Sequence, residues 1–505
     1  MFERVKNFFR KAGANMGVVQ SLQKITDHPK ININQEEYER IAEDFKRFRG
    51  EWDDIVYLNS EKKWQKRPYT TLNMDKVVAE TLSSIVFNEE CEINIADKKA
   101  NDFINEVLKR NDFNKNFSSY LEPMFATGGV ALRPYVNSGT NEIELAWALA
   151  STFYPLKSNT NGIPECAIAT ISTSSEGKQI VYYTLLEFHE WSPDKKYYVI
   201  TNELYRSESA QRVGIRVPLA SIYPKMKEVS VLTKITQPQV SYLKPAGFNN
   251  IDPYSPLGLG LCDNATTTIK QINDSYDQFN WEILMGQRKV IVSDHFLDVS
   301  EDELANGKIK PVFDPTTNVY QGLSVDIDDM QVIDITSDIR AEQYIASINQ
   351  FFKTLEMQTK LSVGTFSFDG KSVKTATEVV SENSLTFRTR NSHLTEVTEF
   401  IQSVVISILE LAAFMELYSG PIPQKKDIDI GFDDGVFTDK NDQLEYYGKA
   451  ASFGFIPSVE AIKRVFSVPE STANEWLELI QKERNGTDPY LQQNNAEKSL
   501  LGEQE

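Results

Sequence analysis

Residues 265–283 read ATTTIKQINDSYDQFNWEI, and the spacing of their apolar side chains decides how the rest of the chain is interpreted. Starting at Ala265, an apolar residue recurs after steps of four, three, four, three and four residues. This period predicts a helix with one narrow apolar seam, which is typical of helices that pack against similar helices. Packing within a single subunit is the alternative. The seam consists of Ile269, Ile272, Tyr276, Phe279 and Ile283.

A second helix is predicted downstream of the first. It begins near Thr336-Ser337-Asp338 and carries apolar residues from Ile339 to Leu355 at helical spacings. The segment between the two helices, residues 287–336, is mixed, with a strand-like run at Lys289–Val292 and several acidic turns. The two helices therefore bracket a small separate module.

A loop and a long helix follow the second helix. The loop, residues 362–374, contains Gly and Ser, and then Thr375 and Glu378 have the spacing of a capping box. The helix that they open can continue to Leu417 and would then be about 65 Å long. Its second half is strongly apolar and its first half is polar. We expect one half in the core and the other near water.

The regions on either side of this helical frame differ from it and from each other. Residues 35–135 are predicted to be mainly helical, with Asn34 as the N-cap of the first helix. Residues 135–245 contain short runs of Val, Ile, Thr and Tyr between turn residues, which predicts strands, best at Ile180–Phe188 and Lys196–Tyr205. A β-rich body inserted in a helical frame belongs to the α+β fold class.

The C-terminal part is predicted to be less regular. Residues 418–445 hold an acidic cluster, and short helices are expected near Ser458–Phe466 and after Pro469. Residues 485–505 are polar and are predicted to be disordered.

The composition of the 505-residue chain limits its function. A formal charge of -19 argues against a tight, non-specific DNA-binding protein, but not against one that DNA slides past. The three cysteines, Cys91, Cys166 and Cys262, show neither disulfide nor zinc-site spacing and indicate buried thiols in a reducing cytoplasm. No run of 18–20 apolar residues indicates a membrane span, so no membrane partner is expected.

Motifs for nucleotide or zinc chemistry are incomplete. In the stretch from Gly364 to Ser372, five residues separate the glycines where a phosphate-binding loop needs four. His189-Glu190 begins like a zinc-protease helix, but Pro193 stands where the second histidine belongs. We therefore expect no catalytic residue, no metal and no cofactor.

Two acidic clusters keep a hydrolase open as an alternative. The run from Asp427 to Gly435 superficially resembles a calcium loop, but Gly431 occupies the fifth position and Thr438 the twelfth. A strand with a solvated acidic turn is the preferred interpretation. The second cluster, Asp326, Asp328 and Asp329, has no evident partner; paired carboxylates can hydrolyse polysaccharides.

Several short stretches, in this order and spacing, resemble the portal (minor capsid) proteins of long-tailed phages of Gram-positive bacteria. No single stretch is diagnostic, but together they cover most of the chain. They are Ile25–Lys30, Thr71–Asp75, Ile85–Glu90, Ala126–Val130, Asn249–Gly258, Lys374–Glu378, Ile430–Asp434 and Gly454–Ile462.

The resemblance implies a portal architecture of wing, stem, clip and small crown. It assigns a wing to residues 1–254, stem helices to 255–286 and 337–361, and a clip to 287–336 between them. It also implies a tunnel loop at 362–374, a long wing helix at 375–417 and a C-terminal wing or crown at 418–484.

The same resemblance implies a function. The chain would form a dodecameric ring at one capsid vertex of the virion, made in the host cytoplasm, through which double-stranded DNA is packaged and ejected. The terminase large subunit and later a head–tail adaptor would dock on it, and major capsid and scaffolding proteins would contact it. A scaffold or adaptor without a pore remains an alternative.

Candidate site residues follow from that assignment. In the tunnel loop, Lys371, Lys374, Ser372 and Ser367 are expected to face DNA, the lysines as phosphate contacts. Two solvated lysines in an ordinary loop are the competing interpretation. The seam from Ile269 to Ile283 is expected to pack between the stem helices of neighbouring subunits.

Overall fold

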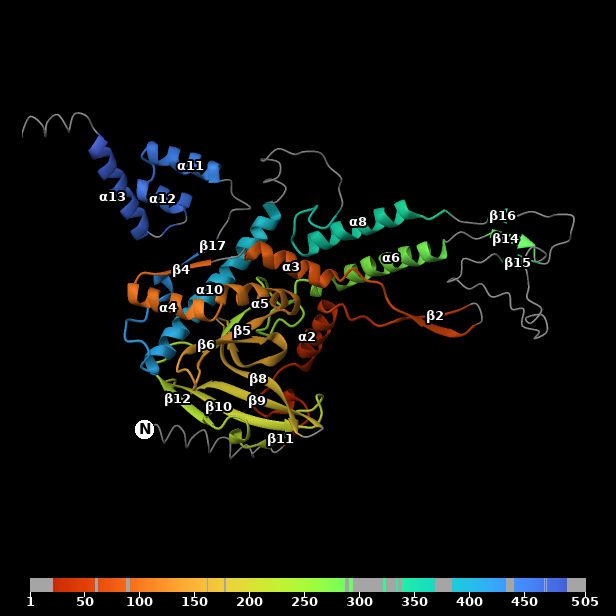
Figure 1. Ribbon diagram of the computed structural model, residues 1–505, viewed down its shortest axis with the longest axis horizontal. Coiled ribbons are helices and arrows are strands. Elements are labelled where there is room, and N and C mark those ends of the chain that lie inside the picture. The colour runs from red at the N-terminus through yellow and green to blue at the C-terminus, as the bar shows by residue number, and fades with distance from the viewer. Residues whose placement is uncertain are drawn as a thin grey trace, which may run out of the picture.

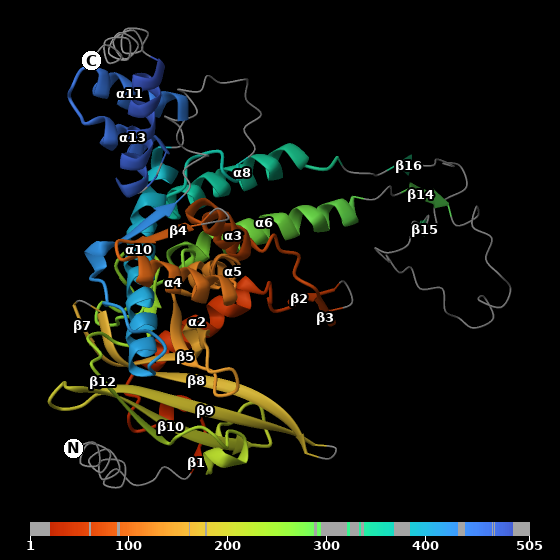
Figure 2. The same ribbon diagram turned by 60° about the vertical axis from the view of Figure 1, so that its left-hand side comes forward.

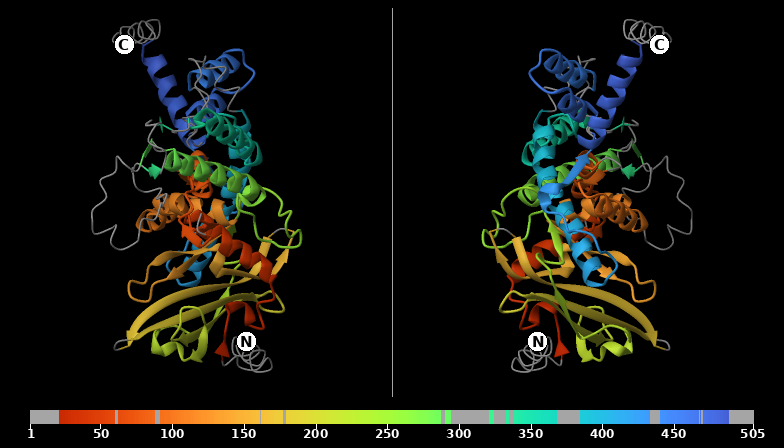
Figure 3. Two further views of the ribbon diagram at one scale, coloured as in Figure 1. Left: turned by 90° about the vertical axis from the view of Figure 1, so that its right-hand side faces the viewer. Right: turned by 90° about the vertical axis from the view of Figure 1, so that its left-hand side faces the viewer.

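A computed structural model describes most of the chain as an elongated molecule with two helices projecting from its body (Figure 1). A large sheet lies at one end of the body and a group of small helices at the other (Figure 3). The residues described are 21–59, 62–87, 91–160, 162–176, 179–286, 290–293, 321–323, 333–334, 338–367, 384–432, 440–466, 468 and 470–487.

Helices predicted in the N-terminal region form the middle layer of the body. Asn34 caps the first of them, its side chain accepting a hydrogen bond from the Glu36 N–H at 3.1 Å. Asn111 and Asp112 separate the last two of them, and Asp112 has a positive φ of 46°. These helices are α2 (Gln35–Phe48), α3 (Met74–Val86), α4 (Lys98–Arg110) and α5 (Phe113–Thr127).

The core is built around α10, Ser384–Phe414, the described part of the expected long helix. Its second half is buried nearly all round, including Val404, Ile408 and Leu409, against α3, α4 and α5. This helix is apolar and long enough to cross a membrane, but 67% of its most apolar window is buried inside the fold. Burial of this kind is typical of the core helix of a globular body.

The expected β-rich segment forms a large antiparallel sheet. Its strand order is β1-β11-β10-β9-β8-β7, and β12 pairs with the other part of β10. Alternate residues of β9, such as Leu186 and Phe188, are buried in a cluster that α2 covers through Tyr38. The strands are β1 (Ser21–Leu22), β7 (Phe153–Asn159), β8 (Gly162–Glu176), β9 (Gln179–Trp191), β10 (Tyr197–Ser207), β11 (Gly214–Val217) and β12 (Val229–Thr233).

Smaller sheets join distant parts of the chain. The acidic run after Asp427 begins as a strand, as expected, and pairs with a strand more than three hundred residues earlier. A separate two-stranded hairpin stands beside the projecting helices (Figure 2). The strands are β4 (Cys91–Ile95) with β17 (Ile428–Phe432), β2 (Ile55–Leu58) with β3 (Trp64–Arg67), and β13 (Ser241–Leu243), β5 (Val130–Val136) and β6 (Ile143–Leu149) in one sheet.

The two projecting helices are α6, Thr266–Met285, and α8, Ala341–Gln358. They lie side by side and antiparallel, because the start of α6 packs on the end of α8 while Glu282 meets Arg340 at the other end. Beyond them lie three short strands (Figure 1). These are β14 (Val290–Ser293), β15 (Gln321–Leu323) and β16 (Ile333–Asp334).

Three helices follow β17. The helix α12, Ser458–Phe466, has the predicted bounds, whereas α11, Lys440–Ser452, was not predicted. The last helix, α13, spans Glu470–Thr487, so residues 485–487 are helical and the predicted disorder is wrong for them. Residues 488–505 lie outside the described part of the chain.

Candidate functional site: the helix pair and its loop

The root of the helix pair is a small apolar core within one subunit. Ile269 and Ile272 are fully buried there, together with Phe352 and Leu355 of α8 and Val78 of α3. The expectation that these two isoleucines pack between subunits is therefore wrong. A seven-residue seam identifies a helix that needs a partner helix, but the partner here is α8 of the same chain.

The seam becomes more exposed toward the far end of α6. Tyr276 is half-buried, and the ring of Phe279 contacts the ring of Tyr344 on α8, with centroids 5.3 Å apart. Ile283 remains 43% exposed. Of the five seam residues, Ile283 keeps the most surface available to a neighbouring subunit.

The β2–β3 hairpin braces α6 at mid-length. Arg67 on β3 donates two hydrogen bonds to Asp277, Nη1 to Oδ1 at 2.6 Å and Nη2 to Oδ2 at 2.5 Å. The Thr70 N–H donates to the same carboxylate at 3.1 Å, and the guanidinium group lies 4.7 Å from the ring centroid of Trp281. Although burial opposes ionisation, these hydrogen bonds lower the pKa of Asp277 below its ordinary value. Neither sequence neighbourhood, around Arg67 or around Asp277, indicates this brace.

A second ion pair joins the far ends of the two helices. Glu282 accepts hydrogen bonds from Arg340, from Nη2 at 2.7 Å and from the backbone N–H at 2.9 Å. These hydrogen bonds lower the pKa of Glu282 to about 2. The pair connects the last turn of α6 to the residue just before α8.

The loop after α8 is anchored by a buried carboxylate, Glu356. Its side chain accepts hydrogen bonds from the backbone N–H groups of Phe366 at 2.6 Å, Ser367 at 2.8 Å and Gly364 at 3.2 Å. Ser367 is only 7% exposed, and its hydroxyl bonds to Glu356 at 3.3 Å. Ser367 therefore differs from the expected DNA-facing residue, because its hydroxyl belongs to the anchor.

The start of the loop is also tied to α10. The Ser362 N–H donates to the Thr386 hydroxyl at 2.9 Å, and the Thr389 hydroxyl donates to the Lys360 carbonyl at 2.7 Å. The remaining loop candidates, Lys371, Ser372 and Lys374, and the expected capping box lie outside the described residues.

The protein family of the chain follows from its similarity to one family model. The family model of phage portal proteins, described as SPP1 Gp6-like, matches residues 27–490. This chain belongs to the phage portal protein family.

Two further comparisons complete this result. No curated protein matches the portal chain. Among solved structures, the neck of an empty GTA particle computed with C6 symmetry is similar at 10% sequence identity and a TM-score of 0.41. That similarity covers 79% of this chain and 91% of the other.

A buried charge cluster fixes the root of α6 in this portal subunit. Arg40 donates to Asp263 at 2.6 Å and to Asp44 at 3.0 Å, and Arg47 donates to Asp44 at 2.6 Å and to Asp75 at 3.0 Å. Two guanidinium groups thus face an excess of carboxylates. Burial, and then the neighbouring Asp263, raise the pKa of Asp44 to about 8.

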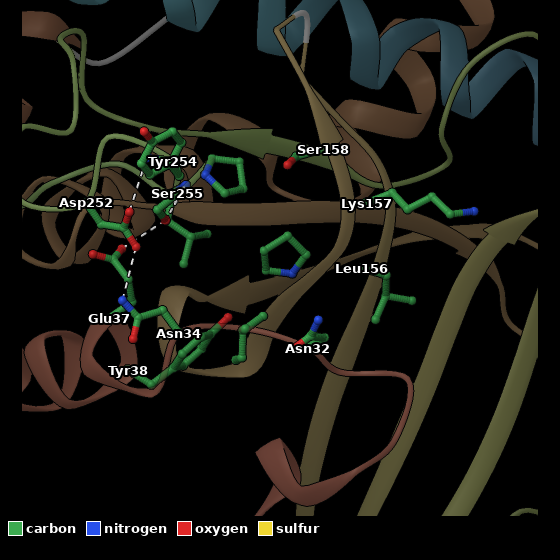
Figure 4. A pocket seen from close by; sticks show the side chains of 14 residues that line it. Asn32, Asn34, Glu37, Tyr38, Leu156, Lys157, Ser158, Asp252, Tyr254 and Ser255 are labelled. Atoms are coloured by element: carbon green, nitrogen blue, oxygen red, sulfur yellow. Dashed lines mark hydrogen bonds between the residues drawn. The ribbon is translucent and has the colours of Figure 1, made fainter. Parts of the chain in front are cut away.

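The turn before α6 joins this cluster through Glu37. Glu37 accepts hydrogen bonds from Ser255 at 3.1 Å and from Arg40 at 3.3 Å. Near this turn, the Asn34 side-chain amide donates a hydrogen bond to the Asp252 carboxylate at 3.1 Å. The two residues line a pocket of about 270 Å³ (Figure 4). The pocket is small, and residues of this turn, of the segment before α2 and of β7 line it.

The described residues bear on two of the chemistries that the sequence raised. They contain no group of three or more His, Cys, Asp or Glu side chains placed to hold a metal ion. His189 lies on strand β9 rather than on a zinc-binding helix, and burial lowers its pKa to about 3. The cysteines Cys91, Cys166 and Cys262 are buried thiols, as the sequence predicted.

Proposed function

We propose that this portal subunit assembles into a ring at one vertex of the capsid and that double-stranded DNA enters and leaves the head through it. In this proposal the paired helices α6 and α8 of all copies form the stem around the channel. Twelve copies are our expectation for the ring. The subunit would be made in the cytoplasm of a Gram-positive host and end in the virion.

The bracing of the helix pair is the observation that carries this proposal. The pair is fixed at its root by the core around Ile269, at mid-length by Arg67 and Asp277, and at its far end by Glu282 and Arg340. Two helices braced at three heights form a stiff strut that projects from the body. A channel wall needs such struts, because it must keep its diameter while a stiff duplex moves past.

The anchored loop supports a role beside the channel. Its first residues are fixed by Glu356 and its far end leads into α10 at Ser384, so both ends of the segment are held on the body. Lys371, Ser372 and Lys374 lie between these anchors and are our candidates for transient phosphate contacts. The overall charge of -19 limits retention of DNA on the rest of the wall.

The projecting end is the proposed docking place for other components. Residues 287–336, between α6 and α8, would form the clip that meets the terminase large subunit and later the head–tail adaptor. The large sheet and the helices around it would form the wing, which meets major capsid and scaffolding proteins. The helices α11 to α13 would form the crown, larger than the two short helices expected from sequence.

Mass photometry and negative-stain imaging of the purified full chain test this function. We expect rings with a central hole and a mass that is a multiple of the subunit mass. A sample that stays monomeric over the accessible concentration range, with activity on a cell-wall polysaccharide, would overturn the proposal in favour of a hydrolase. Solid assemblies without a hole would favour a scaffold or adaptor.

A further inference from the structure

The β2–β3 hairpin has two faces of different character. Partners in an antiparallel pair point to the same side, and neighbours along a strand point to opposite sides. The pairs Tyr57↔Gln65 and Ile55↔Arg67 therefore form one face. The other face is formed by Leu58↔Trp64 and Val56↔Lys66.

The first face is seated on α6 of its own chain. Arg67 binds Asp277, and the ring of Tyr57 lies 5.8 Å from that of Trp281. In both views the hairpin lies on the side of α6 away from α8 (Figures 1 and 2). The hairpin is thus held in place by its inner face, while Val56, Leu58 and Trp64 of its outer face remain exposed.

The outer face is apolar and exposed. Trp64 is 72% exposed, and Leu58 and Val56 beside it are each about half exposed. An exposed tryptophan on a rigidly held ribbon is the kind of residue that dominates protein–protein interfaces, since it contributes a large area at little entropic cost. Lys66 adds a positive charge to the same face.

Each chain also carries a hollow of complementary character. It has a volume of about 630 Å³ and lies between the far ends of α6 and α8 and the base of the hairpin. Trp281, Met285 and Ile339 contribute its apolar surface. Arg67 and Arg340 also line it but are paired with Asp277 and Glu282, and Asp338 adds an exposed acidic residue. The hollow can accept an aromatic side chain accompanied by a cation.

Trp64 does not fill the hollow of its own chain. Arg67 lines that hollow from the inner face of the hairpin, and Trp64, three residues earlier on the strand, points to the opposite side. Trp64 and the hollow of one chain therefore do not contact each other. In an assembly, Trp64 of one copy can enter the hollow of the next.

We propose that the outer face of the hairpin docks Trp64 into the hollow between α6 and α8 of the neighbouring copy, with Lys66 facing Asp338. The contact joins two different surfaces of identical chains, so it is heterologous and can continue from copy to copy until a ring closes. This inference rests on the proposed ring. It assigns the contact between stems to the hairpin instead of to Ile269 and Ile272, which are buried inside each subunit.

Substitution of Trp64 tests whether its side chain holds neighbouring copies together. Trp64→Ala should raise the concentration at which rings dissociate about tenfold or more, measured by mass photometry on dilution. Because the side chain is exposed, the thermal unfolding of the dissociated subunit should stay unchanged. Trp64→Tyr should restore much of the assembly, and Gln65→Ala, on the opposite face, is the matched control. Trp64→Ala rings as stable as those of the unsubstituted chain would overturn the proposal.

Disulfide formation between two separately prepared cysteine variants tests whether Trp64 of one copy reaches the hollow of another. Trp64→Cys and Gln278→Cys proteins are mixed, allowed to exchange subunits and oxidised; the three native thiols are buried. We expect a disulfide-linked dimer in the mixture and little in either variant alone. No dimer in the mixture, with rings present, overturns this contact but leaves the portal function intact. Absence of rings in the unsubstituted chain would instead count against the proposed function.

Discussion

Glu356 and Ser367 are joined by two hydrogen bonds, from the Ser367 N–H at 2.8 Å and from its hydroxyl at 3.3 Å. The carboxylate is completely buried at the end of α8 and also accepts two further backbone N–H groups. A buried carboxylate surrounded by N–H donors fixes the backbone around it, because each donor would otherwise be unsatisfied. The path of the chain from Gly364 to Ser367, just after α8, is therefore held by the Glu356 side chain.

Replacing this carboxylate should loosen the loop. Glu356→Gln keeps the shape but offers an amide N–H₂ toward backbone donors, which should cost about 1–3 kcal/mol in the free energy of unfolding. Hydrogen exchange of the Ser367 amide should accelerate by more than that of the α10 amides. Gln350→Ala, on an exposed position of α8, serves as the control. Unchanged exchange at Ser367 would show that the carboxylate does not hold the loop.

The brace between Arg67 and Asp277 should contribute measurably to stability. Removing the charged acceptor with Asp277→Ala should lower the free energy of unfolding by roughly 2 kcal/mol, the range for hydrogen bonds to charged groups. A double-mutant cycle with Arg67→Ala, followed by denaturant titration, isolates the coupling energy. Additive effects of the two substitutions would contradict a direct brace. Since the pKa of Asp277 is lowered by folding, this contribution should decline as the solution becomes strongly acidic.

The charge cluster at the root of α6 should make the free energy of unfolding depend on pH with a sign opposite to that of Asp277. Folding raises the pKa of Asp44 from 3.8 to about 8, so the folded chain binds the proton more tightly than the unfolded one. Asp44 therefore contributes fully to the free energy of unfolding below about pH 4, and this contribution is lost as the pH rises through about 8. The loss amounts to at most roughly 1.4 kcal/mol per pH unit.

Asp44→Asn, which resembles the protonated acid, isolates this contribution. The stability of Asp44→Asn relative to the unsubstituted chain should rise as the pH increases from 5 to 8, measured by denaturant titration at each pH. Glu43→Gln, on an exposed position of the same helix, should show no such trend. A constant difference between Asp44→Asn and the unsubstituted chain would mean that Asp44 is already ionised at pH 5.

Local patterns in the sequence were sufficient to predict most elements of this fold. The period of α6, the cap at Asn34 and the alternation in β9 are each encoded within a few neighbouring residues. The unpredicted helix α11 begins inside residues 418–445, where the sequence indicated only an acidic cluster.

The contacts of the helix pair could not be predicted in the same way. Arg67 and Asp277 are 210 residues apart, and nothing in either neighbourhood indicates that they meet. The seam of α6 correctly indicated a helical partner, but a repeat carries no information on which chain supplies it. A serine in a polar loop, such as Ser367, is usually exposed, and only the tertiary position of Glu356 buries it.

The paired substitutions Lys371→Ala and Lys374→Ala test whether these two lysines contact DNA in the channel. If these lysines touch passing phosphates, removing two positive charges should reduce packaging or retention of DNA and weaken the dependence of that step on salt concentration. Ring mass and thermal unfolding should stay the same, because Glu356 anchors the described start of the loop through the N–H groups of Phe366 and Ser367. The double variant is compared with Lys270→Ala, an exposed lysine near the root of α6, in a phage complementation assay that measures packaged DNA per particle. Normal packaging by the double variant would exclude the lysines as contacts, and loss of the ring would mean that the segment acts in assembly.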